Sequence, residues 1–144
     1  MNPTMEKFGY PGSLVREYRH WAVLLRPQQT TLGALVLVCK DEAEAFSKIS
    51  AEAFGELPQV TAAIEATLKA SFQYDKINYL MLMMVDRDVH FHVIPRYAGP
   101  RTFARVEFHD PGWPGPPELA RANQAGESLS QELLQLLRRG FQQH

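Results

Sequence analysis

The stretch INYLMLMMVDRDVHFHVI, residues 77–94, predicts two neighbouring strands and the turn between them. From Lys76 to Val85 the residues are mostly large and apolar, as in a buried strand. Asp86 and Arg87 have the chemistry of a turn, and VHFHVI is typical of a return strand. Strands joined by so short a turn pair antiparallel. This stretch therefore predicts an antiparallel sheet.

The residues before this stretch add a second pair of strands. Leu14–Arg26 favours a strand that stops at Pro27, because proline cannot donate a hydrogen bond to the next strand. Ala34–Cys39 predicts the partner strand, and Gly33 permits a tight turn between the two. We therefore expect a hairpin here.

Helical periodicity fills the middle of the chain. Asp41 with Glu44 three residues later resembles a capping box, and the helix that it starts is expected to end at Gly55. A longer helix is predicted from about Pro58. Its core-facing stripe consists of residues four apart: Val60, Ile64, Leu68 and Phe72.

The end of the chain reads as a loop and a last helix. Prolines and glycines in residues 110–117 exclude regular structure, and an amphipathic helix is expected over about 128–142, capped by Ser128. We predict an α+β fold in one domain, residues 1–144, with a core of about 14–108. It has an antiparallel sheet of about five strands, two helices between strands 2 and 3, and a C-terminal helix.

Composition limits the classes of function. A chain of 144 residues with 45% apolar and 22% charged residues is typical of one globular domain. Its net charge of -1 supplies no field that would attract nucleic acid or an anionic membrane. The longest apolar run is too short to span a bilayer, no signal peptide is evident, and the only cysteine is Cys39. We expect a cytoplasmic protein.

Asp88, His90 and His92 alternate with apolar residues, so a strand would project all three from one face. A neutral imidazole can attack phosphorus without a separate base, so His90 could form a covalent nucleotidyl intermediate. His92, about 6.6 Å along the strand, could donate a hydrogen bond to a phosphate oxygen. Release to water would be hydrolysis, and release to another acceptor would be transfer. We expect His90 to stand uncovered at the mouth of a hollow, and a ring buried beneath aliphatic side chains or directed away from every cavity would exclude this mechanism.

The segment VHFHVIPRY, with GALVLVCK upstream, resembles the histidine triad (HIT) family of nucleotidyl hydrolases and transferases. The resemblance extends over roughly residues 17–101, with its specific signature in 90–96. It implies a HIT-like fold, a homodimer, His90 as nucleophile and His92 as a phosphate ligand. The chain departs from the family at the first triad histidine, replaced by Asp88, and at an upstream histidine, replaced by Ala34.

Asp88 cannot simply copy a phosphate-binding histidine, because a carboxylate 4 Å from a phosphate costs about 4 kcal/mol. It could orient His90, hold a ribose hydroxyl, carry a proton, bind a divalent ion or point to solvent at the edge of the strand. Asn78 and Arg96 are further candidates for substrate binding. The alternative for Asn78 is a structural tie to a neighbouring turn, and the alternative for Arg96 is a solvated surface. Arg26 lies where the family often has an asparagine that contacts ribose, and we expect it to be a surface arginine.

Three hypotheses follow for the function. The first is a hydrolase or transferase that cleaves a nucleoside phosphate ester or anhydride, of the dinucleoside polyphosphate or nucleoside phosphoramidate class, through His90. It requires no cofactor beyond a divalent cation carried with the nucleotide. The second is a nucleotide-binding protein with little turnover, and the third is a metal site made by Asp88, His90 and His92. The expected partner is a small nucleotide, not a nucleic acid or a membrane.

Overall fold

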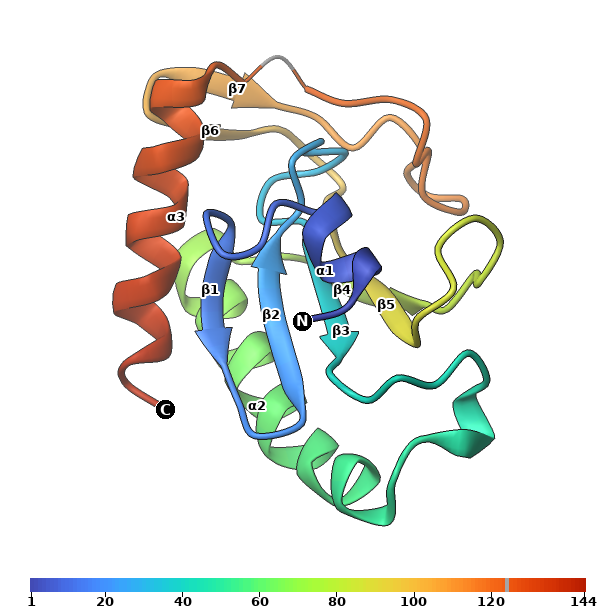
Figure 1. The fold of residues 1–144 in the computed structure, drawn as a ribbon. Helices are drawn as coiled ribbons and strands as arrows, with labels where there is room; N and C mark the ends of the chain where they lie inside the picture. Colours follow the sequence, from blue (N-terminus) through green and yellow to red (C-terminus); the bar gives the residue numbers. More distant parts are fainter. Residues whose placement is uncertain (124) are drawn as a thin grey trace.

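A five-stranded antiparallel sheet forms the centre of the computed structural model, which describes residues 1–123 and 125–144 (Figure 1). The strand order is β1-β2-β3-β5-β4. The bounds are Leu14–Glu17 for β1, Trp21–Leu25 for β2, Leu35–Cys39 for β3, Lys76–Leu80 for β4 and His90–Arg96 for β5. The α+β fold and its antiparallel sheet are as the sequence predicts.

Helices cover both faces of this sheet. Helix α2 (Ala51–Phe72) lies behind it in Figure 1, and α3 (Glu127–Phe141) runs beside β1. The predicted stripe of α2 is buried in the main core: Val60, Ile64, Leu68 and Phe72. Helix α1 (Pro3–Lys7) covers the opposite face, where Met5 packs on a small cluster from β2 and β3. None of the helices in the described residues is long and apolar enough to cross a membrane.

Strand β5 lies between β3 and β4 and has two chemically different faces. His90 pairs with Val38 and His92 with Val36, and both valines belong to the cluster under α1. Val93 belongs instead to the main core on the other face. The predicted alternation is confirmed for the two histidines and places both beneath α1, whereas Asp88 precedes the strand.

The helical boundaries differ from the prediction between residues 41 and 58. Between Asp41 and Ser50 the only helical turn is the 3-10 turn η1 (Phe46–Lys48), and the Asp41 carboxylate accepts from the Ser50 amide instead of closing a capping box. Ser50 caps α2, which continues through Gly55 and Pro58. A Cβ at Gly55 would meet nothing within 4 Å, so this glycine costs only about 1 kcal/mol of helix propensity and does not end the helix.

Several strand boundaries also needed correction. The predicted strand over Leu14–Arg26 is a hairpin of two strands that turns at residues 18–20. Strand β4 ends at Leu80, and residues 81–89 form a loop whose Met84 is 85% exposed. Apolar composition alone cannot distinguish an exposed loop from a buried strand.

Three elements were not predicted. They are α1, β6 (Arg101–Phe103) and β7 (Val106–Phe108), of which the last two pair as a separate hairpin. Ser128 lies inside α3, whose N-cap is Gly126, so the predicted serine cap is wrong.

Candidate functional site

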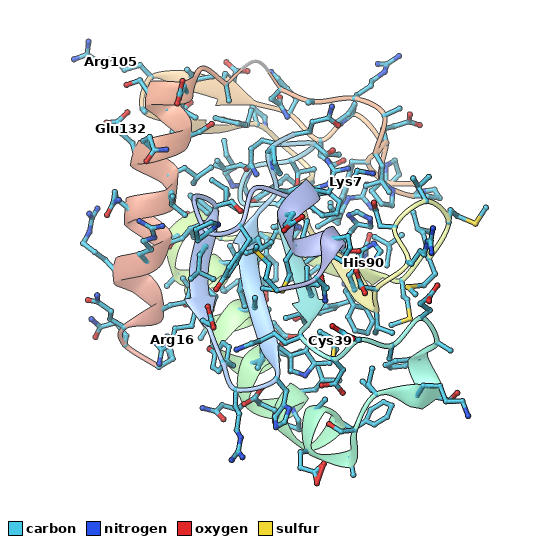
Figure 2. The ribbon with its side chains drawn as sticks, viewed as in Figure 1. Lys7, Arg16, Cys39, His90, Arg105 and Glu132 are labelled. Carbon is cyan, nitrogen blue, oxygen red and sulfur yellow. The ribbon has the colours of Figure 1, made fainter. Side chains whose placement is uncertain are left out.

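The two histidines of β5 line a cavity of about 390 Å³ between α1, the end of β2 and the loop of residues 81–89. Strand β5 supplies its floor, because alternation directs both rings to the α1 face. Figure 2 shows His90 beneath α1, with Lys7 nearby. The remaining lining comes from Lys7, Phe8, Arg26, Pro27, Gln28 and residues 82–86.

One hydrogen bond fixes the tautomer of the neutral His90 ring. Its Nδ1 lies 2.6 Å from the backbone carbonyl oxygen of Asp88, which can only accept, so Nδ1 carries the proton. The lone pair is therefore on Nε2, which has no partner among the described residues and is not sealed from the cavity. A ring held in this tautomer offers Nε2 as a nucleophile.

His90 is more covered than the sequence suggested. It is only 2% exposed, and the Phe8 ring lies 6.2 Å from its own, centroid to centroid. The expectation of an uncovered ring at the cavity mouth is wrong, because α1 was not predicted. The ring lies in the floor of the cavity, whose lining also includes Phe8 and residues 82–86.

His92 is held neutral by its surroundings. Burial lowers its pKa to about 4, and the positive charge of Arg26 adds to the effect. Its Nδ1 is buried with no partner in the described part of the chain. The tautomer with the proton on Nε2 avoids burying an unpaired donor and directs an N–H into the cavity. Such a donor suits a phosphate oxygen.

Arg26 is buried in the cavity wall, not on the surface as expected. Its exposed fraction is 8%, and its amide donates to the carbonyl of Ala34, which extends the β2–β3 pairing by one residue. Its Nη1 donates to the carbonyl of Gln28 and the hydroxyl of Thr30. The alternation of side chains along a strand could have indicated this position, because Arg26 is two residues beyond Leu24 and therefore lies on the same face of the sheet.

Asp88 does not line the histidine cavity; it faces a neighbouring hollow of about 670 Å³. Its carboxylate accepts from the amide of Thr4 at 3.1 Å and from the Thr4 hydroxyl at 2.9 Å. The Asp88 amide also donates to that hydroxyl. Among the roles considered, these contacts favour the orienting one, because the same residue anchors α1 and binds His90 through its backbone.

Helix α1 brings two residues to the cavity that the sequence reasoning missed. The Phe8 ring lies 5.8 Å from that of His92, and Lys7 pairs with Asp86 at 2.8 Å. The only signal for this helix is Asn2 before Pro3, a common helix start. Nothing in so short a segment predicts which strand it covers.

Asn78 and Arg96 lie outside the cavity. Arg96 donates to both oxygens of Asp110, at 2.7 and 3.1 Å, and to the Asn78 side-chain oxygen at 2.8 Å. It also donates to the carbonyl of Gly115. These bonds attach the proline-rich loop to β5 and explain both residues without a ligand.

The metal alternative finds no support. Within residues 1–123 and 125–144, no group of three histidine, cysteine or acidic side chains could hold an ion. The Asp88 carboxylate is occupied by Thr4 instead.

The sequence profile of the HIT domain matches residues 13–99, more than half of the chain. The chain belongs to the HIT family. Solved structures with the same fold include a histidine triad protein from Sinorhizobium meliloti, at 21% identity, 97% and 95% coverage of the two chains and a TM-score of 0.75. A histidine triad protein from Marinobacter aquaeolei is 22% identical, with 96% of this chain and 94% of that chain covered and a TM-score of 0.74. A hypothetical histidine triad nucleotide-binding protein from Sulfolobus tokodaii is 19% identical, with 97% of this chain and 90% of that chain covered and a TM-score of 0.70. No curated protein matches this HIT chain significantly.

Proposed function

We propose that this HIT protein is a nucleotidyl hydrolase or transferase in which His90 attacks the phosphorus of a nucleoside phosphate ester, anhydride or phosphoramidate. The observation that carries the proposal is the bond from His90 Nδ1 to the Asp88 carbonyl. It leaves the lone pair of Nε2 facing a cavity of about 390 Å³, within the usual range of small-molecule sites.

The first step forms a P–N bond. The Nε2 lone pair attacks phosphorus, and the bond from phosphorus to the leaving group breaks with its electron pair going to that group, which takes up a proton from solvent when it is an amine. The ring becomes an imidazolium that keeps its Nδ1–H on the Asp88 carbonyl. In the second step a water oxygen attacks phosphorus, the P–N pair returns to Nε2, and the water proton passes to solvent. Another nucleophile in place of water gives transfer.

The charges around the cavity suit a phosphate. Arg26 and Lys7 supply two positive charges, and the one carboxylate in the lining, Asp86, is already paired with Lys7. The neutral His92 adds an N–H donor for a non-bridging oxygen. A homodimer, a divalent cation carried by the nucleotide and an Asp at the first triad position remain parts of this proposal.

A second candidate is a nucleotide-binding protein with little turnover. The observation in its favour is the low exposure of His90, together with Asp88 and Ala34 at positions where the family has histidines. Under this alternative the cavity still binds a nucleotide.

The two candidates separate in one assay. The purified chain is incubated with an adenosine phosphoramidate and with a diadenosine polyphosphate, and nucleotide products are measured in wild type, His90→Ala and His109→Ala. His109 is a matched control, because its side chain is 62% exposed and outside the cavity. We expect the wild type and His109→Ala to turn the substrates over, and His90→Ala to show no turnover. Nucleotide binding without turnover would support the second candidate, and turnover that survives in His90→Ala would exclude His90 as the nucleophile.

A further inference from the structure

The guanidinium of Arg26 has one edge in use and one free. Nη1 donates to the Gln28 carbonyl at 2.8 Å and to the Thr30 hydroxyl at 2.9 Å. Nε is buried without an acceptor, and Nη2 has no acceptor among the described residues either. Nη2, unlike Nε, is not buried from the cavity, so the Nε–Nη2 edge offers at least one N–H to a carboxylate or phosphate.

Arg96 shows how this chain satisfies a buried guanidinium. It uses the same Nε–Nη2 edge to bind both oxygens of Asp110, whose side chain is fully buried. Arg26 is only 8% exposed, yet no carboxylate in the described residues pairs with it. A buried charge without a counter-charge is unfavourable, so the cavity is organised to receive an anion at this edge.

The sheet register places this edge away from the nucleophile. Along β3, His90 pairs with Val38, His92 with Val36, and Arg26 is bonded to Ala34. Ala34 and Val38 are four residues apart, or about 13 Å along the strand. The order on the floor of the cavity is therefore His90, then His92, then Arg26, with Arg26 two strands away from β5.

Displacement geometry decides which half of the substrate meets Arg26. In an in-line attack the leaving group departs opposite to the attacking Nε2, which is away from the floor of the cavity. The substituents that stay on phosphorus spread along the floor. The nucleoside is among them, and a nucleoside that follows the polar side chains of the floor runs past His92 to Arg26.

We propose that Arg26 binds a second phosphate on the sugar of the retained nucleotide, so that the substrate is a nucleoside 5′-phosphate derivative that also carries a 2′- or 3′-phosphate. This inference rests on the proposed function and narrows its substrate class. Lys7 and Asp86 are the other charges that line the cavity, and they are paired with each other at 2.8 Å. Arg26 is thus the unpaired charge of the cavity lining.

The test compares ligands that are not turned over. Dissociation constants are measured by calorimetry for adenosine 5′-monophosphate and for the adenosine 2′,5′- and 3′,5′-bisphosphates, with the uridine pair as a check on the base. In wild type one bisphosphate is expected to bind at least about tenfold more tightly than the monophosphate, equivalent to about 1.4 kcal/mol. Arg26→Gln should abolish the preference, and Arg26→Lys, which keeps the charge but loses the planar guanidinium, should retain only part of it.

Arg105→Gln is the matched control, because Arg105 is exposed and lies at the far corner of the molecule from His90 (Figure 2). It removes the same charge and should leave the preference intact. Equal binding of monophosphate and bisphosphates by wild type overturns the inference and leaves the proposed function standing; this result needs no variant to fold. An equal loss for all ligands in Arg26→Gln also overturns it, because Arg26 would then bind the reacting phosphate. Failure of every nucleotide to bind wild type overturns both.

Discussion

Thr4→Val tests whether Asp88 holds α1 over the cavity. The Thr4 hydroxyl donates to the buried Asp88 carboxylate at 2.9 Å and accepts from the Asp88 amide at 3.3 Å. Valine keeps the shape of the side chain but removes both bonds. One bond to a charged group and one neutral bond together correspond to a loss of about 2–4 kcal/mol. For a chain of this size that is roughly 6–12 °C in Tm, unless α1 detaches alone at lower cost.

Two measurements cover both cases. Urea unfolding followed by the fluorescence of Trp21, which is fully buried, gives the global free energy of unfolding. Trypsin cleavage after Lys7 reports local detachment of α1. Thr4→Ser is the matched control because it retains the hydroxyl. If Thr4→Val matched Thr4→Ser in both stability and cleavage rate, Asp88 would not be the anchor of α1.

Two further predictions concern buried charge and pH. Arg96→Met leaves the fully buried Asp110 carboxylate without its partner and should destabilise the fold by about 3–5 kcal/mol in urea; a change below about 1 kcal/mol would show that the pair is not structural. His92 has a pKa of about 4 against 6.5 for an ordinary histidine, so the unfolded chain gains a proton first as pH falls. The contribution of His92 to the free energy of unfolding is complete above pH 6.5 and is lost as the pH falls from 6.5 to 4. This contribution is at most about 3 kcal/mol, and about 2 kcal/mol after screening by water. His92→Gln should remove this part of the pH dependence of the free energy of unfolding, and identical profiles would contradict it.

The sequence was sufficient for the features that depend on local periodicity. Spacing of two put His90 and His92 on one face, and spacing of four found the buried stripe of α2. Both patterns follow from backbone geometry and need no tertiary information.

Features that depend on distant segments could not be read in this way. The contacts of Asp88 and Arg96 could not be predicted, because their partners, Thr4 and Asp110, lie 84 and 14 residues away. Arg26 looked like a surface residue because its burial depends on α1 and the loop of residues 81–89, which close the cavity around it. That loop in turn was mistaken for strand, because its apolar composition resembles a buried strand although Leu82, Met84 and Val85 are exposed.

The most direct test of the proposed mechanism is to identify the residue that carries the nucleotidyl group. Wild type is mixed with an adenosine phosphoramidate, quenched in denaturant during turnover, and analysed by intact and peptide mass spectrometry under conditions that preserve P–N bonds. We predict one nucleotidyl group on the peptide that contains His90 and none on the same peptide of His90→Ala. Turnover with no adduct on His90, or with the adduct on another residue, would contradict it.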